Sequence, residues 1–239
     1  MAAERIRLPG IKGTDDRVLV ESTIFPWSAI GRVNKSVGGF CTGTLIAPDR
    51  VLTAAHCLWN QRTGRWLPPS SLHFLAGYQR GEYLEHARIS AFDIPDGYIP
   101  AQAGGPTDPA ADWALLTLEG EVGPGRQPLP AAALDPATLD AYRAAGARIL
   151  QAGYSQDRPH ILTLHDGCEI VGFTEGGRLA VHECDATKGD SGSPILAFED
   201  GSFRIVAMHV ATFRTDGREF GAAVPGITFY RAHAAAAAD

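Results

Sequence analysis

The stretch GFCTGTLIAPDRVLTAAHCLW, residues 39–59, decides the fold class. Two short apolar segments, FCTGTLIA and RVLTAA, lie on either side of the turn-forming residues Pro48 and Asp49. Similar segments recur along the chain between turn residues, among them VLVES, LHFLAGY, WALLTL, CEIVGF and FRIVAMHVATF. Many are β-branched or aromatic and are spaced as in sandwiches and barrels, whereas helical periodicity is scarce. The sequence therefore predicts an all-β protein.

Length and charge limit the classes of function. The 239 residues suffice for one large domain or two small ones with a stable core. The formal net charge of -6 argues against a nucleic-acid partner, and no apolar run approaches the roughly 20 residues that span a bilayer. Residues 1–10 lack the apolar centre of a signal peptide, so we expect any leader to be absent from this chain.

Three further segments suggest how the chain is organised. FEDGSFRIV predicts a hairpin that turns at Asp200 and Gly201, and residues 136–147 and 229–238 are candidate helices. Residues 118–130, LEGEVGPGRQPLP, are rich in Gly and Pro and form the best candidate linker, near the middle of the chain.

Three side chains could act together as a nucleophilic site: His56 in LTAAHC, Asp112 in AADWALLTL and Ser191 in KGDSGSPIL. A serine hydroxyl needs an imidazole to take its proton, and the imidazole needs a buried carboxylate to hold its tautomer. Taken singly, each residue has an ordinary structural explanation in a turn or beside a strand. The nucleophile elbow of the α/β-hydrolases does not fit, because position 193 is Ser193 instead of glycine.

The sequence segments around these residues resemble those of the chymotrypsin-fold (trypsin-like) serine peptidases. GFCTGTLIAPDRVLTAAHCLW is similar to the segment that carries that family's histidine, DWALLTL to its aspartate strand and GDSGSPIL to its nucleophile loop. The resemblance implies two six-stranded antiparallel β-barrels with the active site in the cleft between them, and a short C-terminal helix. We expect an N-terminal segment at 1–17, the first barrel at 18–122 with His56 and Asp112, the second barrel at 123–232 with Ser191, and an alanine-rich tail at 233–239.

The nucleophile loop has further implied roles. By resemblance, the backbone amides of Gly189 and Ser191 form the oxyanion hole. Asp190 is either an ordinary turn residue or the partner of a newly cut N-terminal ammonium that orders this hole. The segment RIRLPGIKG offers Ile6, Leu8 and Ile11 as candidate new N-termini.

The four cysteines fit two local disulfides by the same resemblance. Cys41 would pair with Cys57 and Cys168 with Cys184, each pair 16 positions apart, although other pairings are formally possible. The alternative is a structural zinc site, since His165, Cys168, His182 and Cys184 supply two imidazoles and two thiols. Their spacing differs from that of a zinc finger.

Two cues to substrate preference compete. The N-terminal part and the SGSP after the nucleophile resemble the bacterial branch that contains the glutamyl endopeptidases. Asp185 lies where trypsins carry the aspartate that selects Arg or Lys, whereas His209 lies near the histidine with which glutamyl endopeptidases bind a carboxylate. The pocket of the glutamyl endopeptidases usually has Ser or Thr at the position that Ala186 occupies here, and Thr187 is the next residue along the chain. We lean towards an acidic or undetermined preference.

The sequence thus predicts a serine endopeptidase that forms a covalent acyl-enzyme. The alternatives are a peptidase fold kept as a weakly active or inactive binding module, and a disulfide-stapled structural domain. We expect a peptide or protein substrate, a monomer and no metal or organic cofactor. The expected disulfides suggest a secreted or periplasmic protein.

Overall fold

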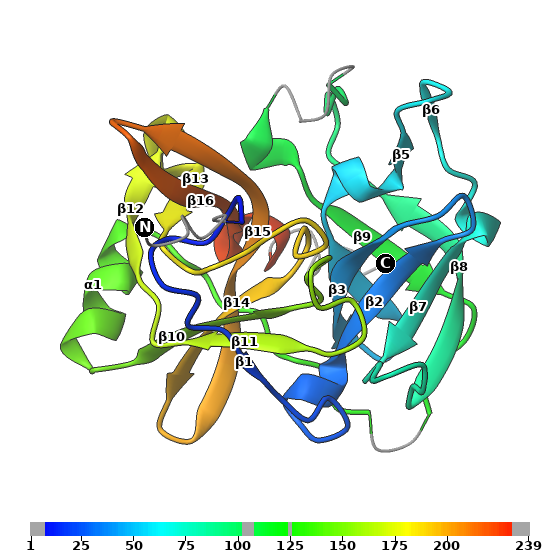
Figure 1. Ribbon diagram of the computed structural model, residues 1–239, viewed down its shortest axis with the longest axis horizontal. Helices are drawn as coiled ribbons and strands as arrows, with labels where there is room; N and C mark the ends of the chain where they lie inside the picture. Colours follow the sequence, from blue (N-terminus) through cyan, green and yellow to red (C-terminus); the bar gives the residue numbers. More distant parts are fainter. Residues whose placement is uncertain (1–7, 102–107, 124–125, 231–239) are drawn as a thin grey trace, which may run out of the picture.

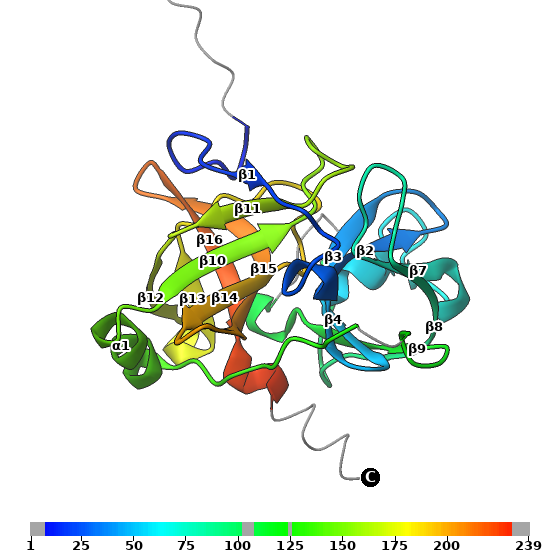
Figure 2. The same cartoon turned by 90° about the horizontal axis from the view of Figure 1, so that it is seen from below.

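The computed structural model describes residues 8–101, 108–123 and 126–230. Two β units lie side by side, the first built by the N-terminal half and the second by the C-terminal half (Figures 1 and 2). The all-β class and the chymotrypsin-like arrangement are therefore confirmed. Within the described ranges, no helix has the length and apolar character that crossing a membrane requires.

The first unit is a closed six-stranded barrel in the order β2-β3-β4-β9-β8-β7. Its interior is filled by side chains with no exposed surface, including Val33, Leu45, Leu52 and Phe74. Its strands are β2 (Ile30–Lys35), β3 (Phe40–Ala47), β4 (Arg50–Thr53), β7 (Leu72–Ala76), β8 (Glu85–Asp93) and β9 (Ala114–Leu118). A small hairpin of β5 (Trp59–Asn60) and β6 (Arg65–Trp66) projects beside it.

The second unit is an eight-stranded sheet in the order β1-β11-β10-β14-β15-β16-β13-β12. Strands β11 and β12 lie near opposite ends of this order but are separated along the chain only by residues 167–169, so they can be counted as one interrupted strand. Counted in this way and without β1, the sheet has the six strands that the resemblance implied for the second barrel. Its strands are β10 (Arg148–Gly153), β11 (Thr163–Asp166), β12 (Ile170–Thr174), β13 (Leu179–His182), β14 (Pro194–Glu199), β15 (Ser202–Thr215) and β16 (Arg218–Pro225).

The remaining strand, β1 (Val18–Leu19), pairs with β11 of the second sheet. Residues 18–19 were expected to open the first barrel, so the structure places them in the other unit. The division of the chain into domains otherwise stays a prediction. A two-residue edge strand has no periodicity of its own, so its partner is set by tertiary packing.

The expected hairpin and helices can be compared directly with the structure. Asp200 and Gly201 have φ values of 49° and 74° and join β14 to β15, as a type I′ turn requires. Helix α1 spans Pro136–Ala144 and begins at a capping box between Asp135 and Thr138. Residues 226–230 are helical, while the rest of the expected C-terminal helix lies outside the described residues. Five short 3-10 helices are η1 (Trp27–Ala29), η2 (Ala55–Leu58), η3 (Pro69–Ser71), η4 (Pro109–Ala111) and η5 (Glu175–Gly177).

The predicted linker is anchored by buried residues, although several of its other described residues are exposed. Leu129 is fully buried, and its N–H donates to the carbonyl of Leu45 in the first barrel at 2.9 Å. Two residues later, Ala131 forms an isolated bridge with Ile205 of β15 in the second sheet. This connection therefore contributes to holding the two units together.

Both local disulfides are present, Cys41–Cys57 and Cys168–Cys184, and the described chain contains no other cysteine. The first ties β3 to η2, and the second ties the turn between β11 and β12 to the segment after β13. In the chain-entropy model, a loop of this size contributes about 3 kcal/mol to stability.

Candidate active site

His56 and Asp112 are brought together at the end of the first barrel. His56 lies on η2, shortly after β4, and Asp112 follows η4, two residues before β9 begins. The Nδ1 atom of His56 lies 2.6 Å from Oδ2 of Asp112, and the backbone N–H of His56 donates to Oδ1 at 2.8 Å. Asp112 has no exposed surface, whereas the imidazole is about one quarter exposed. A carboxylate accepts the hydrogen, so Nδ1 carries the proton and Nε2 carries a lone pair.

Ser191 lies in the turn before β14, and its conformation depends on Gly192. The backbone φ of Gly192 is 85°, in the left-handed region that favours glycine. A Cβ atom at this position would lie 2.2 Å from the carbonyl oxygen of Thr42 and 2.5 Å from Oγ1 of Thr53. Thr42 in β3 donates its N–H to the carbonyl of Ser191 at 2.9 Å. The nucleophile loop is thus docked on the barrel that carries His56.

The amides of Lys188, Gly189 and Ser191 have no acceptor among the described residues. The carbonyl of Lys188 accepts from the N–H of Gln156, and the carbonyl of Asp190 accepts from the N–H of Ser193. In a trans peptide the N–H points opposite to the C=O, so the N–H groups of Gly189 and Ser191 are turned away from Gln156 and Ser193. The arrangement leaves two donors beside Ser191, as an oxyanion hole requires.

His56 and Ser191 line the same pocket, which has a volume of about 360 Å³. Ala186, Thr187 and His209 line it too, and Pro9 of the N-terminal segment contributes to its wall. Among the described residues, Nε2 of His56 and Oγ of Ser191 form no hydrogen bond. In enzymes without bound substrate, catalytic hydrogen bonds are often long and shorten only when the substrate binds.

The pocket contains one end of a buried histidine pair. The N–H of Cys184 donates to Nδ1 of His182, so in the neutral form the proton of His182 lies on Nε2. That atom is 3.0 Å from Nδ1 of His209, which leaves Nε2–H as the remaining ring donor of His209. Burial, with smaller contributions from Lys12 and His56, lowers the pKa of His209 to about 3, so the ring is neutral at pH 7. His182 was expected only as a zinc ligand.

Asp185 does not line this pocket, contrary to the expectation that it binds substrate. It has no exposed surface, and the backbone N–H of Lys12 donates to Oδ1 at 2.6 Å. The ammonium of Lys12 donates to the carbonyls of Gly10 and Cys184 at 2.9 and 2.6 Å. Burial lowers the pKa of Lys12 to about 8, with Asp185 acting against that shift. The N-terminal segment therefore covers Asp185.

The hydroxyl of Thr187 also has a partner, because it donates to Oδ1 of Asp157 at 2.9 Å. Ala186 is held against the N-terminal segment by a bond from its N–H to the carbonyl of Gly10 at 3.1 Å. Of the four residues expected to bind substrate, Ala186, Thr187 and His209 lie on the pocket wall. Only His209 has a ring donor that remains for an occupant.

Asp190 is connected to a buried cation through a serine. Oγ of Ser155 donates to Oδ2 of Asp190 at 2.7 Å and accepts from the guanidinium of Arg17 at 2.8 Å. The side chain of Arg17 is about 1% exposed and pairs with Asp15 and Asp157. Burial raises the pKa of Asp190 to about 6, and its Oδ1 has no hydrogen-bond partner among the described residues.

This arrangement bears on the expected activation step. In this structure, Asp190 already accepts a hydrogen bond from Ser155, which in turn accepts one from Arg17. Of the candidate new N-termini, Ile6 lies outside the described residues, Leu8 is exposed and Ile11 is buried. Pairing of Asp190 with a new N-terminus stays a prediction. Neither Arg17 nor Ser155 was singled out from the sequence, because neither belongs to a motif.

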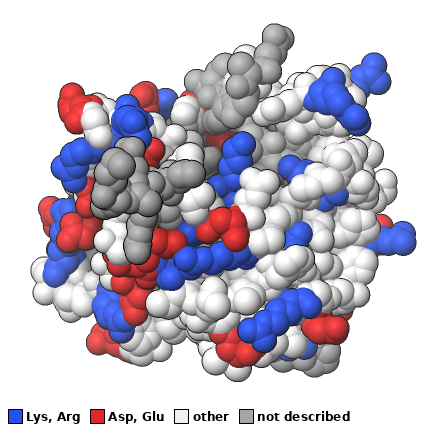
Figure 3. Space-filling model, in the orientation of Figure 1, with Lys and Arg blue, Asp and Glu red and all other residues white. Residues whose placement is uncertain are grey.

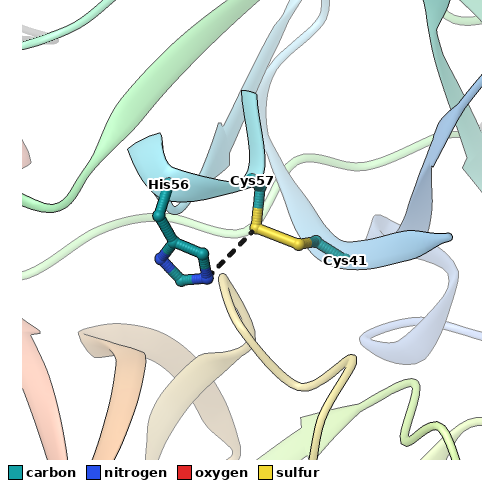
Figure 4. Close-up of side chains that lie close together, drawn as sticks. All are labelled: Cys41, His56 and Cys57. Carbon is teal, nitrogen blue, oxygen red and sulfur yellow. Dashed lines mark hydrogen bonds between the residues drawn. A yellow bond between two sulfur atoms is a disulfide. The ribbon is translucent and has the colours of Figure 1, made fainter. Parts of the chain in front are cut away.

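Three potential metal ligands, Cys41, His56 and Cys57, lie within 4.8 Å of one another (Figure 4). The two sulfurs are joined in a disulfide, and Nε2 of His56 is 3.8 Å from Sγ of Cys57. Disulfide sulfurs are not thiolates, so this group does not offer the ligands that zinc prefers. The same argument removes Cys168 and Cys184 from the alternative zinc set.

Comparison with known proteins identifies the family and the fold. Residues 41–208 match the trypsin-like peptidase domain. The mouse protein Serine protease 23 is 28% identical over 174 residues, which cover 65% of this chain and 42% of that protein. A glutamyl endopeptidase of Bacillus licheniformis is 38% identical over 58 residues, 24% of this chain and 18% of that protein. The chain thus spans about two fifths of the length of Serine protease 23.

A solved structure of a Glu endopeptidase in complex with MPD superposes with a TM-score of 0.76. The match covers 96% of this chain and 100% of that one at 22% identity, and it shows that the fold is the same. The fold and the matched domain together define a trypsin-like serine peptidase fold. The chain belongs to the trypsin-like peptidase domain family.

Proposed function

We propose that the protein is a serine endopeptidase in which His56, Asp112 and Ser191 form a catalytic triad. One observation carries the proposal: a buried carboxylate holds His56 through Nδ1 in the pocket that also contains Ser191. This leaves the lone pair of Nε2 to take a proton, which is the role a general base needs.

The proposed reaction proceeds in two halves. His56 takes the proton of Ser191 as the serine oxygen attacks the substrate carbonyl carbon, and the amides of Gly189 and Ser191 stabilise the resulting oxyanion. When the carbon–nitrogen bond breaks, His56 gives the proton to the leaving amine. Water then attacks the acyl-enzyme, His56 takes its proton and returns it to Ser191, and the acid product leaves.

We propose an acidic residue on the acyl side of the cleaved bond. Neutral His209 has a ring N–H left for the pocket, and a carboxylate is a suitable acceptor. Lys12, which is half-buried beside Asp185, adds positive charge nearby. Asp185, which would attract Arg or Lys, accepts a hydrogen bond from the backbone of the N-terminal segment instead. The names of the glutamyl endopeptidase relatives agree with this preference.

The test is hydrolysis of peptidyl-coumarin amides that differ only in the residue before the cleaved bond. The wild-type protein should cleave the Glu substrate in preference to Gln and Lys. Ser191→Ala and His56→Ala should each lower kcat by several orders of magnitude, with unchanged melting curves. Turnover by Ser191→Ala equal to that of the wild type would refute the mechanism.

A peptidase fold kept as a binding module is the second candidate. It is favoured by the absence of a hydrogen bond between Nε2 of His56 and Oγ of Ser191 in the described part of the chain. It predicts peptide binding without hydrolysis. The two disulfides support an oxidising compartment, so we propose a secreted or periplasmic protein. The monomeric state stays a prediction.

A further inference from the structure

A second pocket shares only His56 with the pocket that contains Ser191. It has a volume of about 500 Å³ and lies between the β2–β3 turn and the β5–β6 hairpin. Lys35, Trp59, Asn60 and Arg62 line it together with His56, and Ser191 does not. His56 therefore contributes to the walls of both pockets.

The ammonium of Lys35 has no ionic partner in this pocket. No described residue forms a hydrogen bond or ion pair with its Nζ, although the side chain is only partly exposed. A Cβ atom built at Gly39 would lie 3.6 Å from Cε and 4.0 Å from Nζ, so the lysine lies against the turn. Burial lowers the pKa of Lys35, and no carboxylate opposes that shift. An anionic ligand would compensate this uncompensated charge.

Arg62 adds a second cation, and its guanidinium also has no carboxylate partner among the described residues. In Figure 3, the upper right of the molecule, over the β5–β6 hairpin, shows blue side chains without red ones beside them. The left side, over the second sheet, shows the two colours mixed. On the face that Figure 3 shows, the hairpin thus carries positive charge without a carboxylate beside it.

The walls of the pocket are held in place without a ligand. The side chain of Asn60 accepts from the N–H of Arg62 at 3.1 Å, which fixes the turn of the hairpin. The rings of Trp59 and Trp66 meet edge to face with centroids 5.1 Å apart. A preformed site loses less conformational entropy on binding than a flexible one.

We propose that this pocket binds an acidic side chain of the substrate on the leaving-group side of the cleaved bond. The inference rests on the proposed function. There, His56 gives its proton to the leaving amine, so the peptide that departs lies on the side of the imidazole away from Ser191. A Glu or Asp within the first residues after the bond would bring its carboxylate to Lys35 and Arg62.

The experiment uses three fluorescence-quenched peptides with the same acyl part and Glu, Gln or Lys as the second residue after the bond. For the full chain, kcat/KM should be about tenfold higher for Glu than for Gln, as for a charged hydrogen bond. The ratio should fall as salt is raised from 20 to 500 mM, because exposed charge pairs are screened. The peptide with Lys should be the poorest substrate.

Lys35→Met should bring the ratio of Glu to Gln close to one. Arg65→Met is the matched control, because Arg65 is exposed on the same hairpin and does not line the pocket, so the ratio should persist. Melting curves of both variants report folding, and the salt dependence of the wild type tests the proposal without any variant.

Three outcomes separate the possible failures. If the coumarin amides of the previous section are cleaved and the wild type treats Glu and Gln alike, this inference is wrong and the proposed function stands. A Glu preference that survives in Lys35→Met and in high salt also overturns it. If no substrate of either kind is cleaved, the proposed function fails, and this inference fails with it.

Discussion

Replacing Gly189 by alanine should damage catalysis far more than folding. The residue has φ = 96°, and a Cβ atom there would lie 2.5 Å from the carbonyl oxygen of Tyr154 and 2.7 Å from Cε2 of Phe40. Real contacts are not this short, so the backbone must move. Left-handed backbone costs a residue other than glycine about 1–2 kcal/mol. The larger effect follows from displacing the Gly189 amide, because one oxyanion donor contributes about 3–4 kcal/mol to the transition state.

The expected result is therefore a kcat for Gly189→Ala that is about 10² to 10³ times lower, with a smaller change in KM. Single-turnover hydrolysis of a peptidyl-coumarin amide measures it, and urea denaturation measures stability alongside. Gly201→Ala is the matched control, since Gly201 has φ = 74°, lies at a hairpin turn and has no atoms within 4 Å of its Cβ position. It should lose about 1 kcal/mol of stability and no activity. A kcat for Gly189→Ala within twofold of the wild type would refute the assignment of this amide.

Three further results are expected. Burial lowers the pKa of His209 to about 3, so below pH 6.5 the unfolded chain binds a proton that the folded protein does not. The contribution of His209 to stability is therefore fully present above pH 6.5. It is lost as the pH falls towards 3, by up to about 5 kcal/mol. Urea denaturation between pH 7 and 4 should show this loss, and His209→Gln should reduce it; identical pH profiles would contradict the cause. Arg17→Met should cost about 3–5 kcal/mol, because it leaves Asp15 and Asp157 without their buried cation, and an unchanged melting temperature would show that the network contributes little. Asp185→Asn should lower stability without altering the ratio of Glu to Lys cleavage, and a shift in that ratio would restore Asp185 to the substrate pocket.

The sequence predicted those parts of the molecule that depend on local signals. Apolar segments between turn residues gave the all-β class, and the two positive φ values at Asp200 and Gly201 follow from the turn residues themselves. His56, Asp112 and Ser191 each lie in a distinctive segment, so their resemblance to a known family could be recognised before any contact was known. The structure then places His56 with Asp112, and His56 with Ser191 in one pocket.

The N-terminal segment could not be placed in this way. The bond from Lys12 to Asp185 joins residues 173 positions apart, and the bond from Arg17 to Ser155 joins residues 138 apart. Neither residue lies in a periodic segment, so no local pattern indicates its partner. Asp185 was expected on the pocket wall only because of its distance along the chain from Ser191. The sequence did not indicate that the N-terminal segment would cover it. Similarly, β1 has two residues, too few for a hydrophobic pattern to select between the two sheets.

The specificity residues show the same limit. His209 was a candidate from its position alone, but the state of its ring depends on His182 and Cys184. Those contacts set which nitrogen carries the proton, and burial keeps the ring neutral. The unpaired charge of Lys35 also arises only when the β2–β3 turn and the β5–β6 hairpin meet.

The most direct test of the central claim is covalent labelling of the active site. The full chain is treated with a fluorophosphonate at pH 7.5, and the adduct is located by mass spectrometry of proteolytic fragments. A site with an activated serine should gain one phosphonyl group per chain, on Ser191, and His56→Ala should label far more slowly. The absence of an adduct on Ser191, or equal labelling of the wild type and His56→Ala, would contradict the account.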